Sequence, residues 1–176
     1  LTVIGVANRM NWPWAAIDDG LTNFAGVDRR LQTKAMIGGI LVIDDYAHHP
    51  TEVAAALRWA RQTQRRVVAV FQPHLYSRTH HLQAEFVEAL SLADEVWVCD
   101  IYPAREAPME GVTSRLLTEP LLKCLQTVFE EPDASVAIGA ALDRCADGDL
   151  LLVMGAGDIG DRLDAILASR RVANQA

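Results

Sequence analysis

Residues 40–50 read Ile-Leu-Val-Ile-Asp-Asp-Tyr-Ala-His-His-Pro, in which an apolar run ends in two aspartates and is followed by adjacent histidines and a proline. A short run of Ile, Leu and Val without alternation is typical of a strand that is covered on both faces of a parallel sheet. Pro50 suits the first turn of a helix. The stretch therefore predicts a buried strand, a polar loop and the start of a helix.

The same succession of apolar run and helical pattern recurs to the end of the chain. We expect strands over residues 40–43, 67–71, 96–101 and 150–154, with residues 136–138 as a further short candidate. Apolar residues at helical spacing predict helices over residues 50–60, 82–93, 114–129, 140–145 and 159–169. Alternating strands and helices indicate an α/β fold: a doubly wound, mostly parallel, Rossmann-like sheet with helices on both faces.

Composition limits the classes of protein to which the chain can belong. The 176 residues are 51% hydrophobic and 22% charged, as in one globular domain, alone or with a short leader. The net charge of −7 argues against nucleic acid or an anionic membrane surface as a partner. Three scattered cysteines predict no disulfide framework. We recognise no signal peptide and no membrane-spanning run, and expect a cytoplasmic protein.

The first 31 residues do not follow the alternation of strands and helices. They contain Trp12, Pro13 and Trp14, and later Gly20 and Gly26. We expect a helical leader over residues 1–23, followed by one domain over residues 24–176.

Polar side chains follow the first two predicted strands at the point where each strand ends. Those after the first strand are Asp44, Asp45, Tyr46, His48 and His49, and those after the second are Gln72, His74, Tyr76, Ser77 and Arg78. Ligands of open parallel sheets bind beyond the carboxyl ends of the strands. Each residue taken singly also fits an ordinary structural role, such as a loop cap or the start of a helix. Their joint position favours a polar site at this edge of the sheet.

A glycine-rich turn, Gly-Ala-Gly-Asp-Ile-Gly at residues 155–160, lies between the last strand and the last helix. This is the position of a dinucleotide-binding fingerprint, which would make the chain an oxidoreductase domain. The fingerprint also needs a later strand that ends in an acidic residue, and no strand follows. Asp158 would repel a phosphate. A tight turn with close packing is therefore favoured, and dinucleotide binding stays as an alternative. The chain has no G-x-x-x-x-G-K-[ST] sequence.

Two longer motifs resemble signatures of the Mur ligase family. They are Asp-Asp-Tyr-Ala-His-His-Pro-Thr-Glu at residues 44–52 and Phe-Gln-Pro-His-Leu-Tyr-Ser-Arg-Thr at residues 71–79. Gly-Val-Asp-Arg-Arg at 26–30, Glu-Ala-Pro at 106–108 and Gly-Ala-Gly-Asp at 155–158 also fit, in the same order. Together they resemble the carboxy-terminal domain of that family, from about Phe24 onward.

The resemblance implies a three-domain, ATP-dependent ligase of peptidoglycan synthesis that forms an amide bond between L-alanine and UDP-N-acetylmuramate. An amino-terminal domain would bind the UDP-sugar, and a central domain would carry the P-loop and most ligands of Mg²⁺. Residues 1–23 would be the tail of that central domain, and we expect no metal ligands in the present chain. The domain would close over ATP, bind the amino acid and be inactive alone. A family member that recycles murein peptides shares the first motif and is the nearer alternative.

The resemblance also implies roles for residues at the nucleotide end of the site. Arg30 is similar in position to an arginine that reaches the ATP phosphates, and His48 would face the same phosphates. Asp45 would accept hydrogen bonds from the ribose hydroxyls, which suits an acceptor-only carboxylate. Tyr46 would lie near the nucleoside.

A second group is implied to hold the incoming amino acid. His74 and Arg78 resemble the residues that bind it, with Arg78 pairing with its carboxylate, as a guanidinium does well. With His48 they are the candidate catalytic residues. Leu75 stands where some members have an arginine, so carboxylate recognition would depend more heavily on Arg78.

Two further functions are compatible with parts of the pattern. One is a nucleotide-binding or scaffolding module without catalysis. The other is a metal hydrolase built on Asp44, Asp45, His48 and His74, although the chain contains no ligand spacing such as H-E-x-x-H.

Overall fold

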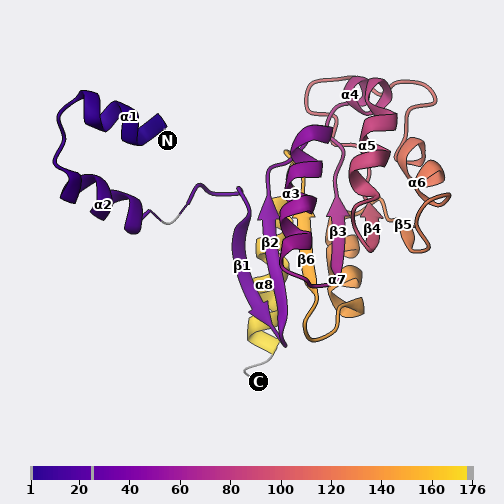
Figure 1. Cartoon of the computed structure of the whole chain (residues 1–176). Coiled ribbons are helices and arrows are strands. Elements are labelled where there is room, and N and C mark those ends of the chain that lie inside the picture. The colour runs from indigo at the N-terminus through magenta and orange to yellow at the C-terminus, as the bar shows by residue number, and fades with distance from the viewer. Residues whose placement is uncertain (1, 25, 174–176) are drawn as a thin grey trace.

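The computed structural model describes residues 2–24 and 26–173, with one six-stranded sheet in the order β1-β2-β6-β3-β4-β5 (Figure 1). The strands are β1 (Gln32–Ile37), β2 (Ile40–Asp45), β3 (Val67–Phe71), β4 (Glu95–Val98), β5 (Val128–Glu130) and β6 (Leu150–Met154). Strand β1 is antiparallel to β2, and all other neighbours are parallel. The prediction of a mostly parallel sheet is therefore confirmed.

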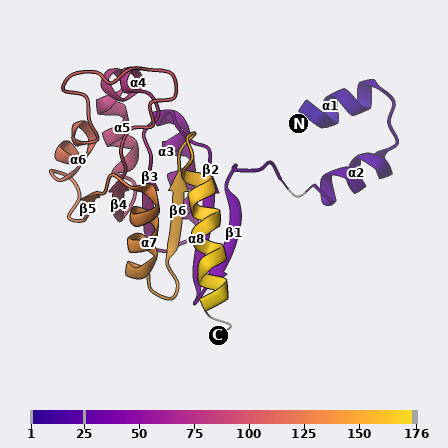
Figure 2. The same ribbon diagram turned by 180° about the vertical axis from the view of Figure 1, so that it is seen from behind.

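Helices cover both faces of the sheet, as predicted (Figures 1 and 2). Helices α3 (Pro50–Gln62), α5 (Gln83–Leu90) and α6 (Arg115–Leu121) pack on one face, and α7 (Ala134–Arg144) and α8 (Ile159–Ala173) pack on the other. Within β3, Ala69 and Phe71 belong to the first core cluster while Val68 and Val70 belong to the second. Successive strand residues point to opposite faces, so both faces of this strand are apolar.

Helix α3 begins where the sequence predicts, and its start is capped. The ring of His49 accepts a hydrogen bond from the backbone N–H of Thr51, and the Glu52 carboxylate accepts from the N–H of His49. Pro50 occupies the first turn, where a missing N–H costs nothing. These contacts fix the loop of residues 46–49 between β2 and α3.

Two expectations from the sequence are wrong. The helix expected over residues 114–129 ends at Leu121, and β5 pairs with β4 instead, Val128 opposite Val96. Residues 136–138 lie in α7, not in a strand, because the Asp133 carboxylate accepts hydrogen bonds from two N–H groups and starts a helix there. A further short helix, α4 (Tyr76–His81), lies between β3 and α5.

Strand β1 was not expected from the sequence. It joins β2 through Gly38 and Gly39, which both have positive φ, at +54° and +79°. Positive φ at both central residues is the requirement of the tight hairpin turn that matches strand twist. The glycine pair before an apolar run was the available signal for this hairpin.

Residues 2–22 form two short helices, α1 (Thr2–Arg9) and α2 (Trp14–Thr22). Both views show them standing apart from the sheet (Figures 1 and 2). Several large apolar side chains here are exposed, including Trp12 at 52% and Trp14 at 64%. No helix within the described residues is long and apolar enough to cross a membrane.

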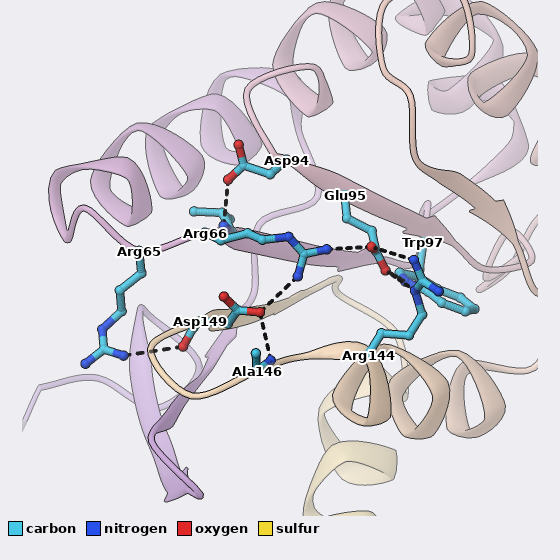
Figure 3. A network of polar contacts seen from close by, with 9 residues as sticks. Arg65, Arg66, Asp94, Glu95, Trp97, Arg144, Ala146 and Asp149 are labelled. Carbon is cyan, nitrogen blue, oxygen red and sulfur yellow. Dashed lines mark hydrogen bonds and ion pairs between the residues drawn. The ribbon is translucent and has the colours of Figure 1, made fainter.

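The amino-terminal edge of the parallel strands is held by a network of charged residues (Figure 3). The Glu95 side chain is fully buried and accepts hydrogen bonds from Arg66 at 2.7 Å, Arg144 at 2.9 Å and the Trp97 indole at 2.8 Å. Arg66 also donates to Asp149 at 2.9 Å. The network joins β3, β4, β6 and α7 at the edge opposite the polar loops.

Candidate active site

The polar loops lie at one edge of the sheet because β6 lies between β2 and β3. Asp45 and Phe71, which end β2 and β3, are both in register with Met154 at the end of β6. The loops that follow these strands, residues 46–49, 72–75 and 155–158, are therefore neighbours. The guanidinium of Arg78 joins two of them, with Nη1 3.4 Å from the carbonyl oxygen of His48.

The rings of Tyr46, His48, His74 and Tyr102 follow one another across this edge. The His48 and His74 centroids lie 5.8 Å apart, and His74 stacks on Tyr102 at 5.7 Å with planes 15° apart. Tyr46 meets His48 edge-on at 5.3 Å. The candidate residues His48, His74 and Arg78 are thus brought together, as the sequence predicted.

His74 is held in its neutral form by its surroundings. Nη1 of Arg78 lies 3.4 Å from His74 Nδ1. Arginine can only donate, so Nδ1 accepts and the ring proton is on Nε2. Burial lowers the pKa of His74, and the charges of Arg78 and His48 lower it further. The ring therefore offers an N–H donor at Nε2 near neutral pH.

We expect Arg78→Ala to raise the pKa of His74, because the substitution removes a positive charge that disfavours the imidazolium. Titration of the His74 ring resonances by NMR, in the chain and in the variant, measures this pKa directly. Arg58→Ala, which removes an exposed arginine of α3, is the matched control and should leave the titration unchanged. An unchanged His74 titration in Arg78→Ala would contradict the observed contact.

His48 has the opposite ring arrangement. Its Nδ1 lies 2.9 Å from the carbonyl oxygen of Tyr46, which can only accept, so Nδ1 carries a proton and Nε2 of the neutral ring is an acceptor. Glu52 lies 3.6 Å from the same Nδ1. Burial raises the pKa of Glu52, but the N–H of His48, the His48 charge and the N–H of His49 outweigh it, so the pKa lies below its ordinary value.

The two aspartates at the end of β2 face opposite sides of the sheet and differ in role. Asp45 is 5% exposed, and its oxygens accept from the N–H of Ala47 at 2.8 Å and of Leu31 at 2.7 Å. Asp44 is 1% exposed and lies 3.3 Å from Nε of Arg29. Burial raises the pKa of Asp44 above its ordinary value, although the charges of Arg29 and Lys34 partly offset this effect.

The four residues of the metal-hydrolase alternative are not assembled into one site, since Asp44 faces away from His48 and His74. Among the residues that the structure describes, no three His, Cys, Asp or Glu side chains are grouped so that they could hold a metal ion.

Arg30 and Tyr46 form the outer part of this edge. The Arg30 side chain is 50% exposed, with Nη1 3.9 Å from Glu52. Its Cζ lies 5.7 Å from the centroid of Tyr46, a distance at which a guanidinium is attracted to the ring. Both side chains are at least partly accessible, whereas Asp45 is buried.

The glycine-rich turn is filled by side chains of the chain itself. A Cβ at Gly157 would collide with Gln72 and Tyr102. Asp158 accepts from Nε2 of Gln72 at 2.9 Å and from Nε of Arg162 at 2.8 Å. The close packing that the sequence favoured is therefore present in this turn.

Two further residues, Tyr102 and Glu106, contribute to the site, and the second of them begins the Glu-Ala-Pro motif of the sequence. Glu106 accepts from the backbone N–H of Ser77 at 3.0 Å and from its hydroxyl, which ties the Glu-Ala-Pro segment to the start of α4. Tyr102 stacks on His74, and its carbonyl oxygen accepts from the N–H of Leu75 at 2.9 Å. Leu75 has a φ of +72°, a disfavoured conformation for a branched side chain.

Comparison with known proteins identifies the family. The family model described as "Mur ligase, glutamate ligase domain" matches residues 29–157, well over half of the chain. The chain belongs to the Mur ligase family. The resemblance inferred from the motifs is therefore confirmed, and the matched residues contain both long motifs and all of the candidate site residues.

Curated Mur ligases with high identity to this chain are named UDP-N-acetylmuramate–L-alanine ligase. The protein from Renibacterium salmoninarum is 50% identical over 149 residues, covering 84% of this chain and 31% of the relative. That from Geobacter sulfurreducens is 41% identical over 179 residues, covering 100% of this chain and 39% of the relative. The chain thus spans about a third of the length of the curated relatives that it matches.

Solved structures with the same fold include other ligases. A domain from a putative UDP-N-acetylmuramate:L-alanyl-γ-D-glutamyl-meso-diaminopimelate ligase of Haemophilus ducreyi matches with a TM-score of 0.59 and 25% identity, over 80% of this chain and 98% of that one. FolC of E. coli, in complex with ADP, matches with a TM-score of 0.70 and 22% identity, over 92% of this chain and 36% of FolC. The α/β fold is thus that of ligase domains.

Proposed function

We propose that this chain is the carboxy-terminal domain of a ligase that uses ATP to join L-alanine to UDP-N-acetylmuramate in peptidoglycan synthesis. The observation that carries the proposal is the meeting of the two motif loops through Arg78, His48 and His74 at one edge of the sheet. The high identity to curated relatives of that name supports this reaction over that of the murein-recycling member.

The nucleotide end of the proposed site is formed by Arg30, Tyr46, His48 and Asp45. Arg30 and Tyr46 offer a half-exposed cation and a partly exposed ring, which fit the phosphates and nucleoside of ATP. His48, with a proton on Nδ1, presents Nε2 at the same edge. The Asp45 carboxylate already accepts hydrogen bonds from the N–H groups of Leu31 and Ala47. A ribose hydroxyl would therefore donate to its remaining lone pairs.

The amino-acid end is formed by Arg78 and His74. Nη1 of Arg78 is held by His48 and His74, which fixes the direction of the guanidinium fork. Its remaining N–H groups would pair with the carboxylate of L-alanine, and Nε2–H of His74 would donate to the same substrate. Holding the amine in place is the main contribution that such residues make to amide formation.

ATP supplies the activation of the carboxylate when it is bound. As the resemblance implies, Mg²⁺ would be held mainly by the rest of the enzyme. Residues 1–23 would belong to the central domain, which fits the exposed Trp12, between α1 and α2, and the exposed Trp14 of α2, in a segment that stands apart from the sheet. Under this proposal the protein works in the cytoplasm, where UDP-linked precursors are made.

A chimeric ligase tests the proposal. In it, this chain replaces the matching segment of the Geobacter sulfurreducens relative, which aligns with the whole chain. We expect ADP release that requires both L-alanine and UDP-N-acetylmuramate, and none from the chain alone. The relative with that segment deleted is the control. A folded chimera without alanine-dependent ADP release would contradict the proposal, and activity with a murein tripeptide instead would favour the recycling ligase.

A further inference from the structure

The side chain of Arg29, to which the sequence motifs assign no role, lies inside the glycine-rich turn after β6. Its Nη2 donates to the carbonyl oxygen of Gly155 at 2.6 Å, and its Nη1 donates to that of Gly157 at 3.3 Å. Its Nε lies 3.3 Å from a carboxylate oxygen of the buried Asp44. Two backbone carbonyls and one buried charge therefore hold the guanidinium.

The last glycine of the turn leaves the room that this guanidinium fills. A Cβ at Gly160 would lie 2.7 Å from Nε and 2.8 Å from Cζ of Arg29, closer than non-bonded heavy atoms approach. Alanine at this position would therefore displace the guanidinium from its two carbonyl partners. The absence of a side chain at position 160 thus makes room for an arginine of the same chain.

The backbone around Arg29 is unusual and is held by its own contacts. Arg29 and Leu31 have φ values of +55° and +44°, in the left-handed region that side chains disfavour. The carbonyl oxygen of Arg29 accepts from the N–H of Tyr46 at 2.7 Å, and the N–H of Leu31 donates to Asp45 at 2.7 Å. Arg30, between the two left-handed residues, depends on these contacts for its position.

We propose that Arg29 is a positioning residue that, by filling the glycine-rich turn, fixes the segment carrying Arg30 and supports one side of the Tyr46 ring. Cζ of Arg29 lies 4.9 Å from the Tyr46 centroid and that of Arg30 lies 5.7 Å from it, so both cations are attracted to the same ring. The turn thus binds an internal cation where a dinucleotide-binding turn would bind an anion. The inference rests on the proposed function only in taking Arg30 and Tyr46 as ATP-binding.

Thermal unfolding of the chain tests the contact itself. We expect Gly160→Ala to lower the Tm, because the new methyl group displaces the guanidinium. In an Arg29→Gln background the same change should raise the Tm by about 2–4 °C, because alanine favours a helix more than glycine does. Gly139→Ala is the control: Gly139 lies in α7 with open space at its Cβ, so alanine should raise the Tm in both backgrounds.

A rise in Tm for Gly160→Ala in the unsubstituted chain would overturn the proposal. The Tm shifts of Gly160→Ala and Gly139→Ala, which we expect to have opposite signs, are measured with Arg29 in place. The comparison therefore remains decisive even where Arg29→Gln prevents folding.

Kinetics of the chimeric ligase test the positioning role. Arg29→Lys keeps the charge but lacks the fork that bridges two carbonyls. We expect it to raise KM for ATP about tenfold with KM for L-alanine unchanged, since small misplacements of binding groups are costly. Gly160→Ala should do the same and Gly139→Ala should change neither. Equal rises in both KM values, or no rise, would overturn the role.

The two proposals fail in different ways. An unsubstituted chimera without alanine-dependent ADP release would contradict the proposed function, while the unfolding data would still decide whether Arg29 fills the turn. An active chimera with the wrong sign of the Gly160→Ala shift would contradict the inference about Arg29 alone.

Discussion

Arg78→Ala is expected to raise the KM of the chimeric ligase for L-alanine about 10- to 100-fold, because a hydrogen bond to a charged group contributes ~1.5–3 kcal/mol. KM for ATP should change far less. In the structure, Nη1 of Arg78 bonds to the His48 carbonyl and to His74, whereas Nε and Nη2 make no hydrogen bond to any described residue. Those free donors suit a carboxylate. Initial rates at varied L-alanine and at varied ATP measure the two constants separately.

Two companion variants sharpen this result. Arg78→Lys keeps the charge without the planar fork, so it should recover only part of the affinity for L-alanine. Asp45→Asn should raise mainly the KM for ATP and leave the KM for L-alanine nearly unchanged, since Asp45 belongs to the proposed nucleotide end of the site. Equal effects of Arg78→Ala and Asp45→Asn on both constants would mean that the two loops do not have separate roles.

The sequence was sufficient for the parts of the fold that are decided locally. The four predicted apolar runs form β2, β3, β4 and β6. A run of apolar residues without alternation has apolar side chains on both faces, so it is stable only where both faces of the strand are covered. The failures involve elements whose form depends on a distant partner. Strand β5 is only three residues long, and it exists because its backbone pairs with β4.

The candidate site also has features that the sequence predicts and one that it does not. Parallel strand order alone brings the loops of His48 and His74 together, and the sequence predicted that meeting. The separation of Asp44 from Asp45 follows from the alternation of side chains along a strand and was available in principle. The position of the Arg29 side chain could not be predicted from the sequence, because its partners Gly155 and Gly157 lie 126 and 128 residues further along the chain.

Glu95→Gln is expected to lower the free energy of unfolding at neutral pH by about 1.5–3 kcal/mol, because it removes the charge that strengthens the hydrogen bonds from two guanidinium groups, of which only Arg66 keeps another carboxylate partner, Asp149. Glu95 is fully buried between Arg66 and Arg144 (Figure 3). Burial raises the pKa of Glu95, but the hydrogen bonds from Arg144 and Trp97 and the two arginine charges outweigh it, so the pKa lies below the ordinary 4.5.

The lowered pKa of Glu95 gives the sign of the pH dependence. A carboxyl whose pKa is lower in the folded chain stabilises it fully above 4.5, and this stabilisation is lost as the pH falls through the folded pKa. Urea unfolding from about pH 7 down to about pH 3.5 should therefore show a steeper loss of stability in the unsubstituted chain than in Glu95→Gln. Glu88→Gln, at an exposed position of α5, is the control and should leave the curve unchanged. Parallel curves for Glu95→Gln and the unsubstituted chain would contradict the lowered pKa of Glu95, since a carboxyl with the same pKa in the folded and unfolded chain contributes no pH dependence of stability.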